Sequence, residues 1–301
     1  KINFIFMSII EQKIIDTHHH LWDPRSKKYD WLVAPGHEVF NNVYLIDDLT
    51  KDFGNLNVVK SVHVQGEINL SEIIYETKWL QEISDNNQFP NAIIGFVDFS
   101  QPEVEMHLQQ HLNYSNFRGI RQILNFDKNN KEISHAQFDF LKEDIWLKNF
   151  SLMQKYNLSF DLSIFWTQSE DALKVINKYK NVLFIINHTL SPINIDDQTI
   201  KEWHRNIKLL SNSENVVIKL SGFGEFNSSW DVSSIKPLIL NSIEEFGIKR
   251  CMFGSNFPVD KALSASKYED YWNAYYSIVK DFSSDEKDKL FYLNAEEYYK
   301  I

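Results

Sequence analysis

Cysteine, glycine and proline are all scarce in this chain of 301 residues, which has one cysteine, nine glycines and seven prolines. The single cysteine, Cys251, excludes an intrachain disulfide and is typical of a protein from a reducing compartment, so we expect a cytoplasmic location. The low glycine and proline content argues against low-complexity sequence and long disordered segments. The composition therefore favours a globular protein with a large core.

Long apolar runs and long basic runs are also missing. No apolar stretch approaches the roughly 18 residues of a membrane-spanning helix. The chain has 31 Lys and Arg residues against 41 Asp and Glu residues, a formal net charge of -10 that repels phosphate backbones. We therefore expect no membrane and no nucleic acid as partners, but a small-molecule substrate. The sequence leaves the oligomeric state open.

The sequence does contain eight short apolar segments that are rich in β-branched and aromatic residues. Each is bounded by polar or turn residues, and several are near-continuous apolar runs, as in strands covered on both faces. They span residues 14–20, 58–67, 92–99, 117–124, 158–165, 182–189, 216–223 and 251–258.

Stretches with helical periodicity lie between most of these segments, at 70–86, 138–156, 203–211 and 232–246. Strands that alternate with helices predict a parallel sheet. Eight such units predict an α/β fold, a distorted (β/α)8 TIM barrel that forms a single domain. No glycine-rich turn after a strand supports a dinucleotide-binding fold instead. We expect residues 1–13 to be an N-terminal extension and residues 14–301 to form the barrel.

Three consecutive histidines end the first predicted strand. Successive side chains on a strand point to opposite faces, so His18 and His20 share a face and His19 points away. Two imidazoles at that spacing can hold one metal ion or bind one substrate. A histidine-rich surface turn is the structural alternative, and the apolar strand before the histidines argues against it.

Polar residues also end the fourth, sixth and eighth predicted strands, on the face where barrel enzymes carry their active sites. His188 ends the sixth and Asn256 the eighth. At the end of the fourth, Arg118 and Arg121 have opposite parity, so at most one faces the barrel mouth. We assign that position to Arg121, which would bind a carboxylate or polarise a carbonyl. A salt bridge to a neighbouring carboxylate is the structural alternative.

Weaker candidates for substrate binding follow other strands. Gln65 and Glu67 share a face after the second strand, and Asp161 lies in the fifth. Trp22 and Trp31 belong to residues 21–47, the longest irregular stretch, which follows the first strand and has the length of a functional loop. The polar residues are equally typical of ion pairs inside the barrel mouth, and the tryptophans of an aromatic cap.

Taken together, these segments resemble the amidohydrolase superfamily. The motifs are DTHHHLWD at 16–23, GIR at 119–121, NH at 187–188, KLSG at 219–222, MFGSNFP at 252–258 and LNAEEYY at 293–299. The closest resemblance is to the amidohydrolase-related branch, which includes L-fuconolactonase-like and 2-pyrone-4,6-dicarboxylate lactonase-like hydrolases. The likeness covers residues 14–299 and is specific for the branch but not for the substrate.

The resemblance implies hydrolysis of a lactone, or of a related C–O or C–N bond, by an activated water. It implies that His18, His20 and His188 surround the site and that Arg121 binds an oxyanion or carboxylate. In this superfamily an aspartate on strand eight moves the proton, but this chain has Asn256 there. An amide cannot act as a general base, so His188, Asp260 or another nearby carboxylate must take the proton in an active enzyme.

The metal site of the superfamily is also altered. No lysine ends the fourth strand and no histidine ends the fifth, so a carboxylated-lysine binuclear site is not available. We expect His18 and His20 to hold at most one divalent ion, zinc, either weakly bound or absent, because the anionic ligand of strand eight is lost.

Three functions follow from these residues. The first is a lactonase that opens a small sugar-acid or dicarboxylate lactone, with His188, Asn256 and Arg121 at the catalytic centre. The second is a metal-dependent decarboxylase or amide hydrolase on the same barrel. The third is a catalytically impaired barrel that binds a sugar acid, because Asn256 replaces the usual aspartate. Fold alone does not choose among them.

Overall fold

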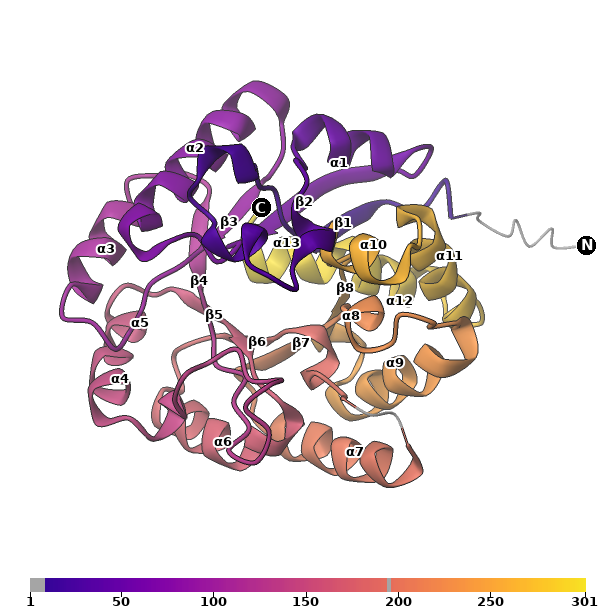
Figure 1. The fold of residues 1–301 in the computed structure, drawn as a ribbon. Coiled ribbons are helices and arrows are strands. Elements are labelled where there is room, and N and C mark those ends of the chain that lie inside the picture. Colours follow the sequence, from indigo (N-terminus) through magenta and orange to yellow (C-terminus); the bar gives the residue numbers. More distant parts are fainter. Residues whose placement is uncertain (1–8, 194–195) are drawn as a thin grey trace, which may run out of the picture.

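Eight parallel strands form one barrel-shaped sheet in the computed structural model, which describes residues 9–193 and 196–301 (Figure 1). They are β1 (Ile14–His19), β2 (Val58–Val64), β3 (Ala92–Gly95), β4 (Phe117–Ile123), β5 (Ser159–Ser163), β6 (Phe184–Ile186), β7 (Val216–Leu220) and β8 (Cys251–Phe253). Each strand pairs with the next along the chain, in the order β1 to β8. The predicted (β/α)8 TIM barrel is confirmed.

The barrel closes just beyond β8 rather than within it. The Asn256 N–H donates to the His18 carbonyl at 2.7 Å, and the His20 N–H donates to the Phe257 carbonyl at 2.7 Å. The register of β1 against β2 also shifts between Asp16 and His19. The segments that carry the histidine motif and Asn256 are therefore part of the barrel wall, fixed by backbone hydrogen bonds.

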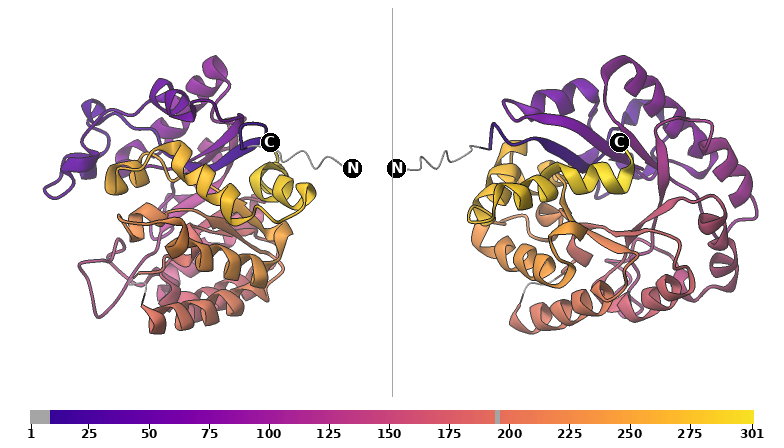
Figure 2. Two further views of the ribbon diagram at one scale, coloured as in Figure 1. Left: turned by 90° about the vertical axis from the view of Figure 1, so that its right-hand side faces the viewer. Right: turned by 180° about the vertical axis from the view of Figure 1, so that it is seen from behind.

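Helices surround the barrel, as the side and rear views show (Figure 2). The helices are α1 (Ile46–Phe53), α2 (Ile73–Asn87), α3 (Val104–His111), α4 (Asp144–Asn149), α5 (Ser151–Lys155), α6 (Ser169–Lys178), α7 (Asp197–Ser211), α8 (Phe223–Phe226), α9 (Val232–Phe246), α10 (Val259–Ser264), α11 (Tyr268–Ile278), α12 (Ser284–Asp288) and α13 (Asn294–Tyr299). Side-chain caps fix the starts of a few helices; the Asp231 carboxylate, for example, accepts from the Ser234 N–H at 2.8 Å and caps α9. No helix in the described part of the chain is long and apolar enough to cross a membrane.

The C-terminal helix α13 closes the end of the barrel at which the strands begin. Tyr299 packs with the small apolar core inside the barrel. Its carbonyl accepts from Arg118 Nε at 2.9 Å, and Lys60 pairs with Glu296 at 2.8 Å. Because β2 and β4 contribute Lys60 and Arg118 near their starts, this plug leaves the opposite end, where the strands end, for a ligand.

The predicted strands and helices match the structure best at strand starts and worst at strand ends. Six of the eight strands begin at the predicted residue, and every one ends earlier than predicted. The predicted helix at 138–156 is interrupted, since α4 and α5 occupy only part of it, and α7 begins before the predicted 203–211. Residues 1–8 of the predicted extension lie outside the described residues, and its boundary stays a prediction.

Candidate active site

The structure brings His18, His20 and His188 together at the barrel mouth. The ring centroids of His18 and His20 are 5.0 Å apart, and those of His18 and His188 are 4.3 Å apart. His19 lies elsewhere, with Nε2 2.9 Å from the Ser61 hydroxyl. The alternation that placed His18 and His20 on one face agrees with these contacts.

An unusual backbone presents His188 to this cluster. His188, Thr189, Leu190 and Ser191 have φ values of 51°, 49°, 63° and 47°, a region that non-glycine residues seldom adopt. Such conformations cost about 1–3 kcal/mol each and persist where the surroundings impose them. Gly222 is part of those surroundings, because a Cβ built on it would lie 2.6 Å from the His188 ring. Close packing of backbone against imidazole therefore fixes the ring.

All three imidazoles are neutral. Burial lowers the pKa of His18, His20 and His188 well below the usual range, Arg121 lowers each pKa further, and Lys219 also lowers the pKa of His18 and His188. His20 Nδ1 lies 2.7 Å from the Val64 carbonyl, which can only accept, so the proton is on Nδ1 and Nε2 carries a lone pair. His188 Nδ1 contacts the Ser221 hydroxyl at 3.1 Å.

A buried ion pair lies beneath the cluster. Lys219 and Asp161 are both fully buried, and Lys219 Nζ is 2.5 Å from Asp161 Oδ1. The Asn187 amide donates to the same oxygen at 3.0 Å. Lys219 Nζ also lies 3.5 Å from His18 Nδ1. Asp161 thus binds Lys219 and Asn187 and is not among the residues that line the cavities described below. Its predicted contact with substrate stays a prediction.

The donor set does not fit a tightly held metal ion. Among the described residues, no group of three or more His, Cys, Asp or Glu side chains is arranged to hold one. Donation from Lys219 to His18 Nδ1 leaves the proton on Nε2, which is buried without a partner among the residues that the structure describes. A protonated nitrogen donates hydrogen bonds but cannot ligate a metal. The predicted weak site on His18 and His20 stays a prediction, and no step below requires it.

Arg121 points from β4 into the same region. Its side chain is buried, and Nη2 donates to the Gln65 carbonyl at 2.5 Å. Its Nε–H is buried with no partner among the described residues. A buried, unpaired donor of a guanidinium is costly unless a ligand supplies the acceptor. Arg118, by contrast, bonds at the other end of the barrel.

Asn256 joins two carboxyl groups that the sequence motif alone does not connect. Its Nδ2 donates to Asp260 Oδ1 at 2.8 Å and to Glu225 Oε2 at 3.1 Å. Burial, reinforced by the charge of Glu225, raises the pKa of Asp260 to about 8. Burial also raises the pKa of Glu225. Asp260 lies behind Asn256, whereas Glu225 reaches the cavity described next.

A central cavity of about 500 Å³ collects these groups. Its lining includes His20, Arg121, His188, Glu225 and Asn256, together with Trp22 and Trp31 from the long segment after β1. The two indoles meet edge to face at 5.4 Å between centroids, and Trp31 Nε1 donates to the Gly66 carbonyl at 2.8 Å. The segment 21–47 therefore supplies an aromatic wall. His18 is not among the lining residues.

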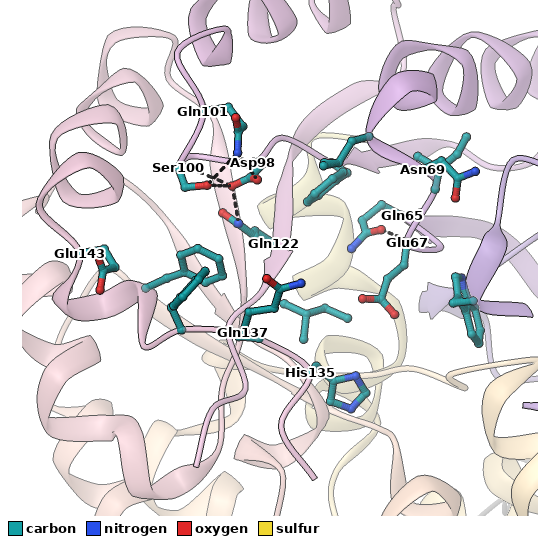
Figure 3. Close-up of a pocket in the computed structure, with 18 of the residues that line it drawn as sticks. Gln65, Glu67, Asn69, Asp98, Ser100, Gln101, Gln122, His135, Gln137 and Glu143 are labelled. Atoms are coloured by element: carbon teal, nitrogen blue, oxygen red, sulfur yellow. Dashed lines mark hydrogen bonds between the residues drawn. The ribbon is translucent and has the colours of Figure 1, made fainter. Parts of the chain in front are cut away.

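A second cavity, the side cavity, adjoins the central one and measures about 630 Å³ (Figure 3). Both are lined by Trp31, Glu67, Ile123 and His135. Gln65 lines only the side cavity, whereas Glu67 borders both. The predicted substrate contacts Gln65 and Glu67 are thus placed at the mouth, in two adjoining compartments.

Sequence reasoning missed Glu225 and His135. Glu225 belongs to the one-turn helix α8, and His135 to the segment between β4 and β5. The position of Glu225, five residues after β7 ends at Leu220, was a usable signal, because residues that follow barrel strands face the active site. His135 had no such signal, since it lies twelve residues after β4 ends.

The profile of the family described as amidohydrolase matches residues 15–301. The chain belongs to the amidohydrolase family. It is 37% identical over 296 residues to the uncharacterised protein y4mH of Sinorhizobium fredii, covering 96% of this chain and 98% of that one. It is 24% identical over 292 residues to an L-fucono-1,5-lactonase of Burkholderia ambifaria, covering 95% of each.

Solved structures agree with the fold of this amidohydrolase. An amidohydrolase of Burkholderia multivorans, crystallised with bound zinc, superposes with a TM-score of 0.81 at 21% identity and covers 96% of this chain and 99% of that one. At such identity the likeness shows the fold alone. The predicted family and the prediction of a hydrolase are confirmed.

Proposed function

We propose that this amidohydrolase hydrolyses the lactone of a small sugar acid in the central cavity. The observation that carries the proposal is the buried Arg121, whose Nε–H lacks a partner among the described residues, beside neutral imidazoles on a cavity of about 500 Å³. That arrangement offers a cationic donor to the oxygen that becomes negative when water adds to an ester carbonyl. The relative named L-fucono-1,5-lactonase supports the same chemistry.

The charges around the cavity favour a neutral sugar lactone over a dicarboxylate lactone. Arg121 is the one Lys or Arg side chain among the described residues that line the central cavity. Glu67, Glu132 and Glu225 bring carboxylates to the same lining. One guanidinium serves the reacting carbonyl, and a substrate with two further carboxylates would meet repulsion from these side chains.

Glu225 takes the role of general base in this proposal. Asn256 cannot accept the proton of water, and the lowered pKa of His188 makes that imidazole a weak base. Glu225 lines the cavity, and its raised pKa brings it closer to the working pH of a base. Asn256 positions this carboxylate through its amide, at 3.1 Å.

The reaction then balances as a simple ester hydrolysis. Water loses a proton to Glu225 while its oxygen bonds to the carbonyl carbon, and Arg121 stabilises the oxyanion. The ring C–O bond breaks as the tetrahedral intermediate collapses, and Glu225 returns the proton to the leaving alkoxide. The product is the open hydroxy acid. His188 and His20, both neutral, orient water and substrate hydroxyls.

A pH-indicator assay over a panel of sugar γ- and δ-lactones and dicarboxylate lactones tests the proposal. We expect turnover of at least one sugar lactone by the purified protein, with the rate maintained in chelator. Lactone opening that depends strictly on added zinc would contradict the metal-free mechanism, and the decarboxylase or amide hydrolase alternative would need turnover of its own substrates with the same dependence on metal. Absence of turnover by both the wild type and Asn256→Asp, with sugar acids still bound, would favour the binding barrel.

A further inference from the structure

The side cavity gives the barrel mouth more room than a single lactone ring needs. It measures about 630 Å³ and shares Trp31, Glu67, Ile123 and His135 with the central cavity. Either cavity alone lies within the roughly 300–1,000 Å³ of pockets that enclose a small ligand. A monocyclic lactone held at Arg121 would therefore leave the adjoining compartment to water.

The floor of the side cavity is built from amides and carboxyl groups that hold one another. Gln122 Nε2 donates to Asp98 Oδ1 at 2.9 Å, and the Ser100 hydroxyl donates to the same atom at 2.7 Å. Gln65 is buried, and its Oε1 accepts from the Glu67 N–H. Figure 3 shows Gln65, Glu67, Gln122 and Gln137 around one space.

Glu67 stands at the border of the two cavities in a backbone conformation that its neighbours impose. Its φ is 58°, the left-handed region. The turn before it is held on both sides, since the Gly66 N–H donates to Glu76 at 2.9 Å, and Trp31 donates to the Gly66 carbonyl at 2.8 Å. Arg121 holds the Gln65 carbonyl at 2.5 Å. The backbone at Glu67 is thus held in place, and its exposed side chain lines both cavities at their border.

The residues that line the side cavity favour an uncharged ligand group that carries hydroxyls. No Lys or Arg is found among the described residues that line the side cavity, while Glu67, Asp98 and Glu143 are acidic. Carboxylate and phosphate groups would find no cation there. A hydroxyl donates and accepts at once, so it can pair with both an amide and a carboxylate. Trp31, Phe96 and Phe140 add aromatic faces for the C–H surface of a sugar ring.

We propose that the side cavity is a subsite for a neutral glycosyl group attached to the lactone. The preferred substrate would then be the lactone of a disaccharide acid, with the lactone ring at Arg121 and the second sugar between Gln65, Glu67 and Gln137. This inference rests on the proposed lactonase function and names its substrate class.

Two commercial lactones test the subsite directly. Lactobiono-1,5-lactone carries a neutral galactosyl group, and glucono-1,5-lactone is its counterpart without that group. We expect the wild type to show a kcat/KM at least tenfold higher for lactobiono-1,5-lactone. Gln137→Trp, which adds bulk at an exposed position of the side cavity, should bring the ratio close to one. Gln110→Trp, at an exposed position of α3 away from both cavities, should keep the wild-type ratio.

The outcomes separate the subsite from the lactonase proposal. A wild type that hydrolyses glucono-1,5-lactone as well as lactobiono-1,5-lactone, or a Gln137→Trp variant that keeps the preference, overturns the subsite and leaves the lactonase standing. A greater preference for a lactone with an amino sugar overturns the neutral assignment. If no lactone is hydrolysed, the proposed function fails. The subsite is then tested by calorimetry with methyl β-galactoside, and a protein that does not bind this sugar overturns the subsite as well.

Discussion

Glu225→Gln is the substitution that bears most directly on the proton transfer. The glutamine amide oxygen can still accept from Asn256 Nδ2, now 3.1 Å from Glu225 Oε2, so the fold and the position of Asn256 are retained. The proton acceptor is lost. General base catalysis contributes roughly 10²–10⁴-fold, so we expect kcat to fall by that factor, or about 2.7–5.4 kcal/mol of transition-state stabilisation.

The pH profile distinguishes a base from a structural carboxylate. Burial raises the pKa of Glu225, so the wild-type kcat/KM should rise with pH through a value above the usual range of glutamate. Glu225→Gln should abolish this limb. The matched control is Glu214→Gln, an exposed glutamate just before the start of β7, which should retain both the rate and the limb.

A second carboxylate offers a rescue. In the Glu225→Gln background, Asn256→Asp restores a carboxylate at the end of the eighth strand, and we expect it to recover part of the lost kcat. The measurement is the initial rate on one sugar lactone over a pH series that runs from the usual pKa range of glutamate upward. If Glu225→Gln keeps more than about a tenth of wild-type kcat and the same acid limb, Glu225 is not the base and the mechanism is refuted.

Three further predictions concern the support of the site. Gly222→Ala should displace the His188 ring, because the φ of Gly222 is 75° and a Cβ at this position would lie 2.6 Å from that ring. We expect kcat/KM to fall more than about tenfold with an unchanged circular dichroism spectrum. An unchanged rate would contradict the packing argument. Lys219→Met leaves the fully buried Asp161 unpaired, so urea unfolding should show a loss of about 3–5 kcal/mol, whereas a loss below about 1 kcal/mol would show that the pair contributes little. Burial raises the pKa of Asp260 to about 8, against 3.8 in the unfolded chain, so between these values the folded state keeps a proton that the unfolded state loses. The free energy of unfolding should therefore fall as pH rises from about 4 to 8, and Asp260→Asn should flatten that slope. An equal slope in both proteins would refute the raised pKa of Asp260.

The barrel could be predicted from the sequence because burial of its strands leaves a clear apolar pattern. Strands covered on both faces must be apolar almost throughout, so their starts stand out from the polar turns before them. Their ends do not, because the chain leaves the sheet through left-handed residues, Glu67, His188 and Asn256 among them, whose side chains give no sign of that turn. Those turns are where the site is built.

The site was only partly predictable for a related reason. Strand parity found His18, His20 and Arg121, since alternate residues of one strand share a face. Asp161 was selected only for its place in the fifth predicted strand, and the structure pairs it with Lys219 two strands away, a partner that no local pattern reveals. Glu225 escaped because its role depends on Asn256, 31 residues further along the chain, which holds it through a hydrogen bond.

The most direct test of the central claim is the initial rate of sugar-lactone opening by the wild type and by Arg121→Met, both in chelator. The proposed function predicts that the wild type opens a sugar lactone without added metal. Loss of one oxyanion donor predicts a fall in kcat of about 10²–10³-fold in Arg121→Met. A wild type that opens no lactone of a broad panel, or an Arg121→Met variant as fast as the wild type, would contradict the account.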